Sequence, residues 1–141
     1  MIILPSPPAL WTFYDFGYLG GRTPIFDWYE NEISDRARLS FDALVKNNQK
    51  IPNQLEWSSV DKQMQGILKG HQVWQWRIPG ELQYRMLGVF HGLKKAVFLM
   101  GCYHKGRKYT PTDALGTTLE RKKLLEKGDC KLHERPIKLD Q

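Results

Sequence analysis

The sequence predicts an α+β fold in which a small antiparallel sheet of about four strands carries helices on one face. Strand-like runs occur once near the amino terminus and three more times in the second half, where only short turns separate them. Such short connections favour an antiparallel meander. A chain of 141 residues has the size of one domain. We therefore expect a single domain over residues 1–141, with a core at 10–127 and irregular tails at 1–9 and 129–141.

The first half of the chain predicts one strand followed by two helices. Leu10–Phe16 is dense in aromatic residues, which favour strands. Pro24 lies near the start of a helical stretch over Phe26–Lys50, in which apolar residues recur every three to four positions. Ser34 is a good helix cap, so it divides this stretch into two helices.

The second half predicts a short helix, three strands and a final helix. Ser58 and Asp61 stand three positions apart, as in a capping box, and predict a short helix through Leu68. Apolar runs bounded by turn residues predict three strands, at Val73–Ile78, Tyr84–Phe90 and Ala96–Tyr103. Thr110-Pro111 has the chemistry of a helix start, and Gly128 that of a helix end.

Composition and charge favour a globular protein with a polyanionic partner. Hydrophobic residues make up 41% of the chain and charged residues 26%, so wholesale disorder is not expected. The net charge of +6 favours polyanions through counterion release. Two cysteines do not make a disulfide framework, and the proline-broken amino terminus is a poor signal peptide. No run approaches the roughly 20 apolar residues of a membrane span, so we expect a soluble, cytoplasmic protein without membrane partners.

Alternation along the strands separates buried from exposed side chains. Trp74, Trp76 and Ile78 share a face, which predicts that they pack against helices while Arg77 points to solvent. The last strand of the meander is apolar over Ala96–Met100 and then changes abruptly to polar residues. Such a change marks a rim where a ligand meets the sheet, or simply the point at which solvent begins.

The same three strands bring together side chains that can bind and cleave a phosphodiester. The set comprises Arg77, Tyr84, Arg85, Tyr103, His104, Lys105, Arg107, Lys108 and Tyr109. Cations bind phosphate oxygens, and a histidine with an unperturbed pKa of about 6.5 exchanges protons near neutral pH. RNA is therefore the first substrate to consider.

Several short motifs follow one another in a distinctive order between residues 26 and 127. They are Leu68-Lys69-Gly70, Trp74–Arg77, Tyr84-Arg85, Val97–Gly101, Tyr103-His104-Lys105 and Thr110-Pro111. In this order and spacing they resemble the RelE/HigB toxin superfamily of type II toxin-antitoxin systems, and within it the phage-derived HigB-like branch. The resemblance implies a RelE/ParE-like fold and a ribosome-dependent mRNA endoribonuclease, or mRNA interferase. Such enzymes use no metal or other cofactor, because the ribose 2'-hydroxyl attacks the adjacent phosphate and leaves a cyclic phosphate.

The resemblance also implies roles for individual residues. Arg77 and Arg85 would hold the scissile phosphate, since guanidinium groups fit phosphate oxygens. His104 would act as acid or base, and Tyr103 or Tyr109 would stack on a base or position the 2'-hydroxyl. The expected catalytic set is thus Arg77, Arg85, His104 and Tyr103. The residues expected to bind RNA are Lys69, Lys105, Arg107, Lys108 and Tyr109.

The implied partners are the ribosome, mRNA and a cognate helix-turn-helix antitoxin, which would form a hetero-oligomer with the toxin. Two other functions remain open: a ParE-like, non-enzymatic inhibitor of DNA gyrase, and a phage-derived binding protein without catalytic activity. Individual residues also have simpler explanations. Arg77 could form a structural ion pair with a helix carboxylate, and His104 could be an exposed residue at a strand end.

One set of residues raises the question of a metal site. Cys102, His104, Cys130 and His133 provide the ligand types of a structural zinc site. The first pair is spaced too tightly for the common motif, and the second lies in the expected tail. We therefore predict no metal, and the sequence leaves open whether these four residues bind one.

Overall fold

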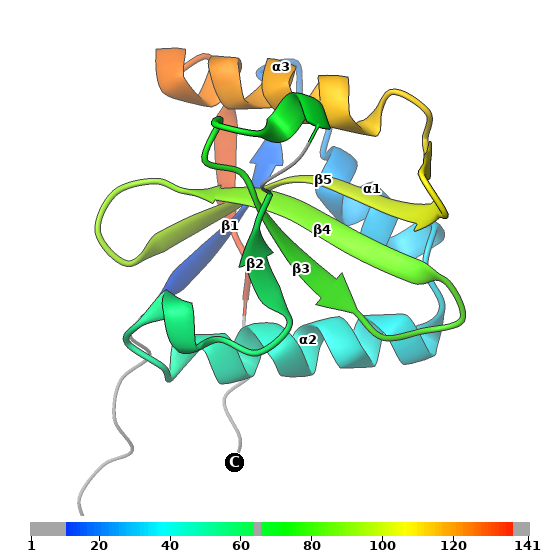
Figure 1. Ribbon diagram of the computed structural model, residues 1–141. Coiled ribbons are helices and arrows are strands. Elements are labelled where there is room, and N and C mark those ends of the chain that lie inside the picture. Colours follow the sequence, from blue (N-terminus) through cyan, green and yellow to red (C-terminus); the bar gives the residue numbers. More distant parts are fainter. Residues whose placement is uncertain (1–10, 64–65, 137–141) are drawn as a thin grey trace, which may run out of the picture.

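The computed structural model describes residues 11–63 and 66–136, which form a sheet with helices on both of its faces (Figure 1). The strands are β1 (Thr12–Gly17), β2 (Val60–Lys62), β3 (Trp74–Ile78), β4 (Gln83–Phe90), β5 (Lys95–Lys105), β6 (Lys108–Thr110) and β7 (Lys131–Glu134). The helices are α1 (Pro24–Asn31), α2 (Asp35–Gln49) and α3 (Ala114–Lys127), with two short 3-10 turns, η1 (Gln54–Glu56) and η2 (Gly66–Leu68). Within these described ranges, no helix combines the length and the apolar character that a membrane crossing needs.

Over the described residues the sheet has seven strands and is mixed, so the prediction of an antiparallel sheet of about four strands is wrong, although the α+β class holds. Six strands follow the order β2-β3-β4-β5-β1-β7, and β6 pairs with β5 outside this path. β1 runs parallel to β5, with Phe13 opposite Ala96. The remaining pairs between described strands are antiparallel. Local patterns reveal strands but not which distant strands pair, and for this reason the sequence missed the parallel pair.

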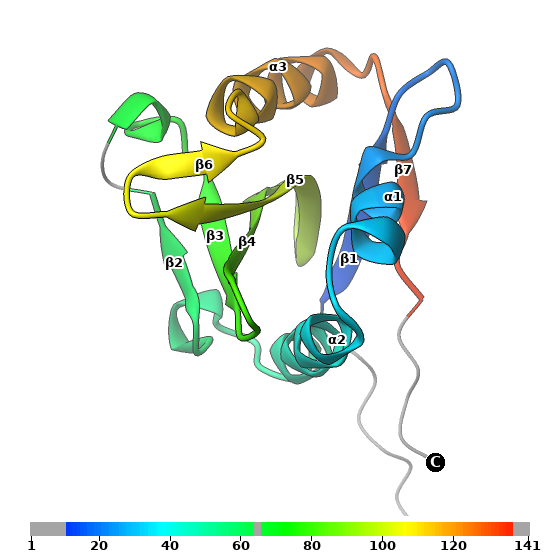
Figure 2. The same ribbon diagram turned by 90° about the vertical axis from the view of Figure 1, so that its right-hand side faces the viewer.

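Helices cover both faces of the sheet, whereas the sequence predicted helices on one face. Trp28 of α1 packs on Gly101 of β5, and Nε1 of Trp76 donates to Asn48 of α2 at 2.9 Å, so both helices lie on the same face. α3 packs against β4 and β5 from the other side, where Arg121 enters the sheet. Figures 1 and 2 show α2 and α3 on opposite sides of the strands. Both faces of β4 and β5 are apolar, so both need a cover.

Several elements match the sequence prediction. The Ser34 side chain accepts a hydrogen bond from the N–H of Ala37 at 3.1 Å and caps α2. α3 ends at Gly128, which adopts the left-handed conformation (φ 74°) that glycine tolerates. The three strands predicted in the second half are present as β3, β4 and β5. Caps and hydrophobic periodicity act over a few residues, so the sequence shows them directly.

Three short strands are absent from the prediction. The expected helix through Leu68 is replaced by β2 and η2, because Val60 and its neighbours pair with β3. α3 begins at Ala114, beyond Pro111, because residues 108–110 form β6. The tail expected to be irregular contains β7, which pairs with β1. Each of these strands gains its hydrogen bonds from a partner elsewhere in the chain. Leu10 of the first predicted strand, the tail at 1–9 and positions 137–141 lie outside the described residues.

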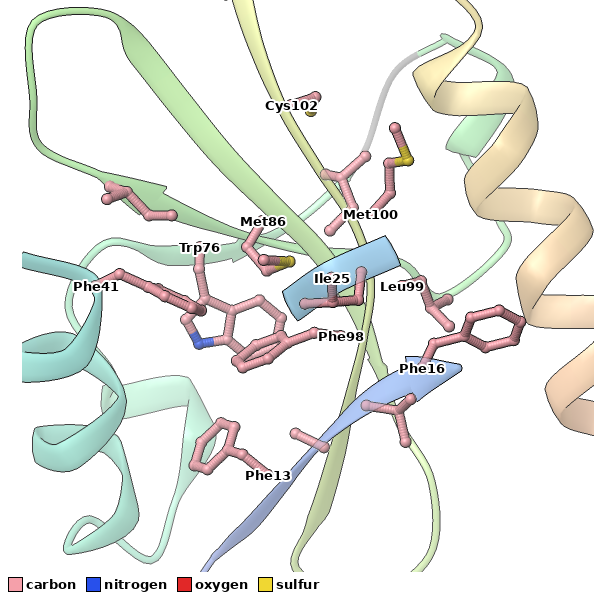
Figure 3. Close-up of a cluster of buried hydrophobic side chains, with 14 of the residues drawn as sticks. Phe13, Phe16, Ile25, Phe41, Trp76, Met86, Phe98, Leu99, Met100 and Cys102 are labelled. Atoms are coloured by element: carbon pink, nitrogen blue, oxygen red, sulfur yellow. The ribbon is translucent and has the colours of Figure 1, made fainter. Parts of the chain in front are cut away.

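An aromatic cluster fills the space between the sheet and α2 (Figure 3). Trp76 is fully buried and meets Phe98 edge to face, with ring centroids 5.0 Å apart. Phe98 stacks on Phe13 at 5.5 Å and contacts Phe41 of α2 at 5.2 Å. Aromatic pairs at such distances add to the stabilisation from burial. The cluster therefore joins β1, β3 and β5 to α2. The candidate site lies on β3, β5 and the strand β4 between them.

Candidate nucleic-acid interface

The face of the sheet opposite α1 and α2 carries two arginines side by side. In the strand register, Arg77 of β3 lies opposite Arg85 of β4, and Arg85 lies opposite Cys102 of β5. Residues directly opposite each other point to the same face, with Cβ atoms about 5 Å apart. His104 follows Cys102 by two positions and shares this face, as a diagonal neighbour of Arg85 at roughly 7–8 Å. The register thus brings Arg77, Arg85 and His104 onto one surface.

Helix α3 covers a different part of the same face. The pairing of β4 with β5 is irregular between Leu87 and Gly88, and Leu99 of β5 is skipped there. Nη1 of Arg121 donates to the Leu99 carbonyl at 2.7 Å and fixes α3 over this irregularity. Further along the strands Arg77 is exposed. The surface formed by Arg77, Arg85, His104 and Tyr109, here called the arginine–histidine face, is therefore open to a ligand.

Arg85 holds a charge in unfavourable surroundings. Its side chain is half-buried, and its Nη1 donates to the Tyr84 carbonyl at 2.9 Å. Its buried Nε finds no hydrogen-bond partner among the described residues. Burial, followed by the neighbouring charge of Arg77, lowers the pKa of Arg85. An anion placed between the two guanidinium groups would satisfy the free donor and offset the repulsion.

Arg77 already has a weak anionic partner. Its Nη2 lies 3.5 Å from Oδ2 of Asp61 on β2, and the two side chains are 47% and 46% exposed. Asp61 also accepts a hydrogen bond from Gln75 at 2.6 Å. The structural ion pair considered from the sequence thus exists, although with a strand carboxylate. Exposed pairs contribute about 0–1 kcal/mol, so a phosphate can displace Asp61 at low cost. The sequence missed Asp61 because its spacing from Ser58 favoured a helix cap.

His104 has a defined tautomer when neutral. Its Nδ1 lies 3.1 Å from the carbonyl oxygen of Gly106, which can only accept, so Nδ1 donates. Nε2 is then the unprotonated nitrogen and can take up a proton. Tyr109 of β6 lies opposite His104, with ring centroids 5.4 Å apart. Burial raises the pKa of Tyr109, so the phenol stays protonated and offers a donor and an aromatic surface.

Tyr103 does not join this group, which corrects the catalytic set expected from the sequence. It lies on the opposite face, paired with Tyr84 at a ring-centroid distance of 6.3 Å. There it lines a cavity of about 420 Å³ together with Trp28 and Arg121. The sequence contained a signal for this separation. Adjacent residues of a strand point to opposite faces, so Tyr103 and His104 cannot both face one bond.

The cations expected to bind RNA surround the arginine–histidine face without forming one surface. Lys105 and Lys108 are paired across the β5–β6 hairpin and share the face of Tyr103. Arg107 lies in the turn between these strands, and Lys69 follows η2. All four are exposed. Long flexible side chains at these places can reach a nucleic-acid backbone that runs across the rim of the sheet.

The four residues considered as zinc ligands are divided between two regions. Cys102 is buried opposite Arg85 on the central strand β5, and burial raises the pKa of its thiol to about 12. Such a thiol stays protonated and is a poor metal ligand. His133 lies opposite Asp15 at the far edge of the sheet. Across the described ranges, no three His, Cys, Asp or Glu side chains gather closely enough to hold a metal ion.

Comparison of the chain with protein-family models, with curated proteins and with solved structures finds no match to any of them. The chemistry of the site is therefore inferred from its geometry. Two guanidinium groups can hold a phosphate, Nε2 of His104 can take up a proton, and Tyr109 can stack on a base. A phosphate-binding pair of cations and a proton acceptor are two of the features that metal-independent cleavage of RNA requires.

Proposed function

We propose that this protein is the toxin of a type II toxin-antitoxin system and a metal-independent, ribosome-dependent mRNA endoribonuclease. One observation carries the proposal: Arg77, Arg85 and His104 lie together on an open face of the sheet. The motif order between residues 26 and 127, which resembles the RelE/HigB superfamily, supports the same activity. The net charge of +6 favours a polyanionic substrate.

The proposed reaction is a transfer of the phosphate within the RNA strand. Nε2 of His104 takes the proton of the ribose 2'-hydroxyl, and the 2'-oxygen forms a bond to the adjacent phosphorus. The bond from phosphorus to the 5'-oxygen of the next nucleotide breaks. That oxygen takes a proton from water, and the protonated His104 neutralises the remaining hydroxide. The products are a cyclic phosphate and a free 5'-hydroxyl.

Arg77 and Arg85 stabilise the charge that develops on the phosphate. Nε of Arg85, which lacks a partner among the described residues, would donate to a phosphate oxygen. Arg77 would exchange its exposed ion pair with Asp61 for the same phosphate. Tyr109 would hold a neighbouring base beside the imidazole. Bound RNA would thus give Nε of Arg85 a partner and replace Asp61 as the partner of Arg77.

The remaining predicted partners follow from this activity. The ribosome would present the message, so the protein would act in the cytoplasm. Lys69, Lys105, Arg107 and Lys108 would contact ribosomal or messenger backbone independently of sequence. A helix-turn-helix antitoxin, bound in a hetero-oligomer, would neutralise the toxin.

The test is induction of the chain in growing cells followed by primer extension on a translated message. The wild-type protein should inhibit growth and cut the message. Arg85→Ala and His104→Ala should each reduce cleavage by roughly 10²–10⁴-fold, since each removes a group that acts in the transition state. Arg36→Ala and His91→Ala are matched controls, because both residues are exposed and lie away from the arginine–histidine face. Both controls should remain toxic.

Three outcomes would contradict the proposal. Undiminished cleavage by folded Arg85→Ala and His104→Ala proteins would remove the site assignment. Blocked replication with intact messages would point to ParE-like inhibition of gyrase. Harmless accumulation of the folded wild-type protein would point to a binding protein without catalytic activity.

A further inference from the structure

The first helix and the turn after it are acidic in a chain that is otherwise basic. Between Thr23 and Asp35 the sequence contains four carboxylates and no lysine or arginine. Glu30 of α1 and Asp42 of α2 are both exposed. These helices lie on the face of the sheet opposite Arg77 and Arg85. The negative charge of α1 disfavours a polyanion beside this helix, so a ligand there has a different chemistry.

A groove between α1 and α2 combines this acidity with an apolar wall. It encloses about 630 Å³ and extends from the two helices to β1 and the segment after β7. Figure 2 shows α1 and α2 beside β1 and β7. Phe26 and Leu39 line the groove and are 53% and 71% exposed. Large apolar side chains with this exposure on two facing helices are typical of a surface that another molecule covers.

Asp15 lines the groove, and one of its two carboxylate oxygens accepts no hydrogen bond from the described residues. The residue is 8% exposed, and its Oδ2 accepts a hydrogen bond from Nη1 of Arg135 at 2.9 Å. The Arg135 guanidinium stacks on Tyr29 and Phe41, at 4.6 and 4.8 Å from the ring centroids. Oδ1 of Asp15 is buried and has no hydrogen-bond partner within the described part of the chain. Such an acceptor is costly unless a ligand supplies a donor.

The charges around the groove favour a cationic donor. Three carboxylates line it, those of Asp15, Glu30 and Asp42, against the two cations Lys46 and Arg135. One further positive charge would balance the set. The apolar wall meanwhile requires a hydrophobic group beside that charge.

We propose that this groove binds a basic, amphipathic segment of a partner protein. An apolar side chain of the partner packs between Phe26 and Leu39, and a lysine or arginine reaches Oδ1 of Asp15 past Glu30. The inference does not rest on the nuclease proposal, because the two sites lie on opposite faces of the sheet and share no residue.

The test uses three synthetic peptides of about 14 residues, a length that permits helix formation. The first has leucine at every third or fourth position and lysine between, which is an amphipathic helical pattern. The second replaces lysine by glutamate, and the third replaces leucine by serine. Only the leucine–lysine peptide should bind saturably in calorimetry. In nuclear magnetic resonance spectra it should shift the amide signals of Phe26, Leu39 and Asp15.

Two pairs of variants locate the site. Leu39→Ser and Glu30→Gln should each weaken binding of the leucine–lysine peptide by roughly tenfold. Leu55→Ser is the control for the first, since Leu55 is 73% exposed but lies outside the groove. Glu32→Gln is the control for the second, since Glu32 caps the carboxyl end of the same helix and lies outside this groove. Both controls should change the affinity less than twofold.

The proposal is overturned if no peptide binds at millimolar concentration or if the leucine–glutamate peptide binds equally well. Equal losses in the groove variants and their controls would overturn it too. Circular dichroism of the variants establishes that they are folded, and all four substituted residues are exposed. Loss of RNA cleavage in Arg85→Ala leaves this inference unaffected, so the two proposals fail independently.

Discussion

Arg85 keeps a positive charge where burial and a neighbouring cation both oppose it. These two causes lower its pKa, with burial the larger. A guanidinium nevertheless remains protonated at neutral pH because its ordinary pKa is above about 12. The side chain is therefore a cation with an unused donor next to Arg77. A bound phosphate would stabilise this arrangement, and the proposed catalytic role depends on that contact.

The two cysteines should differ sharply in reactivity. Cys102 is fully buried with a thiol pKa of about 12, whereas Cys130 is only half-buried, although burial raises its pKa as well. With a disulfide reagent at about pH 8, Cys130 should react first, and Cys102 only when the protein opens, roughly 100-fold more slowly or less. Absorbance of the released thiolate measures both phases. The Cys130→Ser protein should lose the fast phase, and a persistent fast phase would contradict the burial of Cys102.

Tyr29 should make stability fall at alkaline pH. Burial and the hydrogen bond that its hydroxyl donates to Asp42 raise the pKa of Tyr29 to about 12 from 10.0. Below pH 10 both states keep the proton. Between about pH 10 and 12 only the folded state keeps it, so the stabilisation from Tyr29 is lost as pH rises through this window. Urea midpoints of wild-type and Tyr29→Phe proteins should therefore converge across it. A constant difference would show that Tyr29 ionises alike in both states.

Strand β5 is the element around which the other strands are arranged. It pairs with β4 along most of its length, with β1 near its start and with β6 near its end. Helices pack on both of its faces, and one of them approaches very closely. A Cβ atom on Gly101 would lie 2.1 Å from the indole of Trp28. β5 can therefore pack this closely against α1, and still position His104, only if residue 101 is a glycine.

Gly101→Ala should destabilise the protein by about 1–3 kcal/mol, because α1 must move away from the sheet. The matched control is Gly116→Ala in α3, where a new Cβ meets no atom within 4 Å among the described residues. In a helix this replacement should stabilise by up to about 1 kcal/mol. Chemical denaturation of the two variants measures both effects. Equal stability of the two proteins would show that Trp28 does not pack as described.

The whole molecule is closed at one edge by the carboxyl-terminal strand. β7 pairs with β1 over Tyr14 to Gly17. Arg135, just after β7, pairs with the buried carboxylate of Asp15. This contact also lies in the acidic groove, so the end of the chain contributes to one of the two proposed sites. The arginine–histidine face lies on the other side of the sheet and does not include β7.

Ending the chain at Gly128 should destabilise the protein by about 2 kcal/mol or more. The truncation removes the strand partner of β1 and leaves Asp15 without the cation that offsets its burial. Burial already raises the pKa of Asp15, and the loss of Arg135 should raise it further. Thermal unfolding measures the change, with Lys131→Ala, an exposed change within β7, as the control. An unaltered midpoint after truncation would contradict the role assigned to this edge.

The sequence alone determined the features that depend on neighbouring residues. The Ser34 cap, the Gly128 helix end and the strands containing Trp76 and Phe98 follow from patterns only a few residues long. The same alternation separated Arg77 from Trp76, with the arginine exposed and the tryptophan buried. The alternation also predicts that Tyr103 and His104, as adjacent strand residues, point to opposite faces, and the structure places them so.

Only the tertiary structure decided how these elements assemble. β1 lies parallel beside β5, β7 closes the edge of β1, and α3 covers the second face of the sheet. Asp61 likewise meets Arg77 only because β2 pairs with β3. Strand pairing depends on complementary surfaces brought together across the chain, which hydrophobic periodicity does not encode. The free energy that selects one partner over another arises from packing that exists only in the folded molecule.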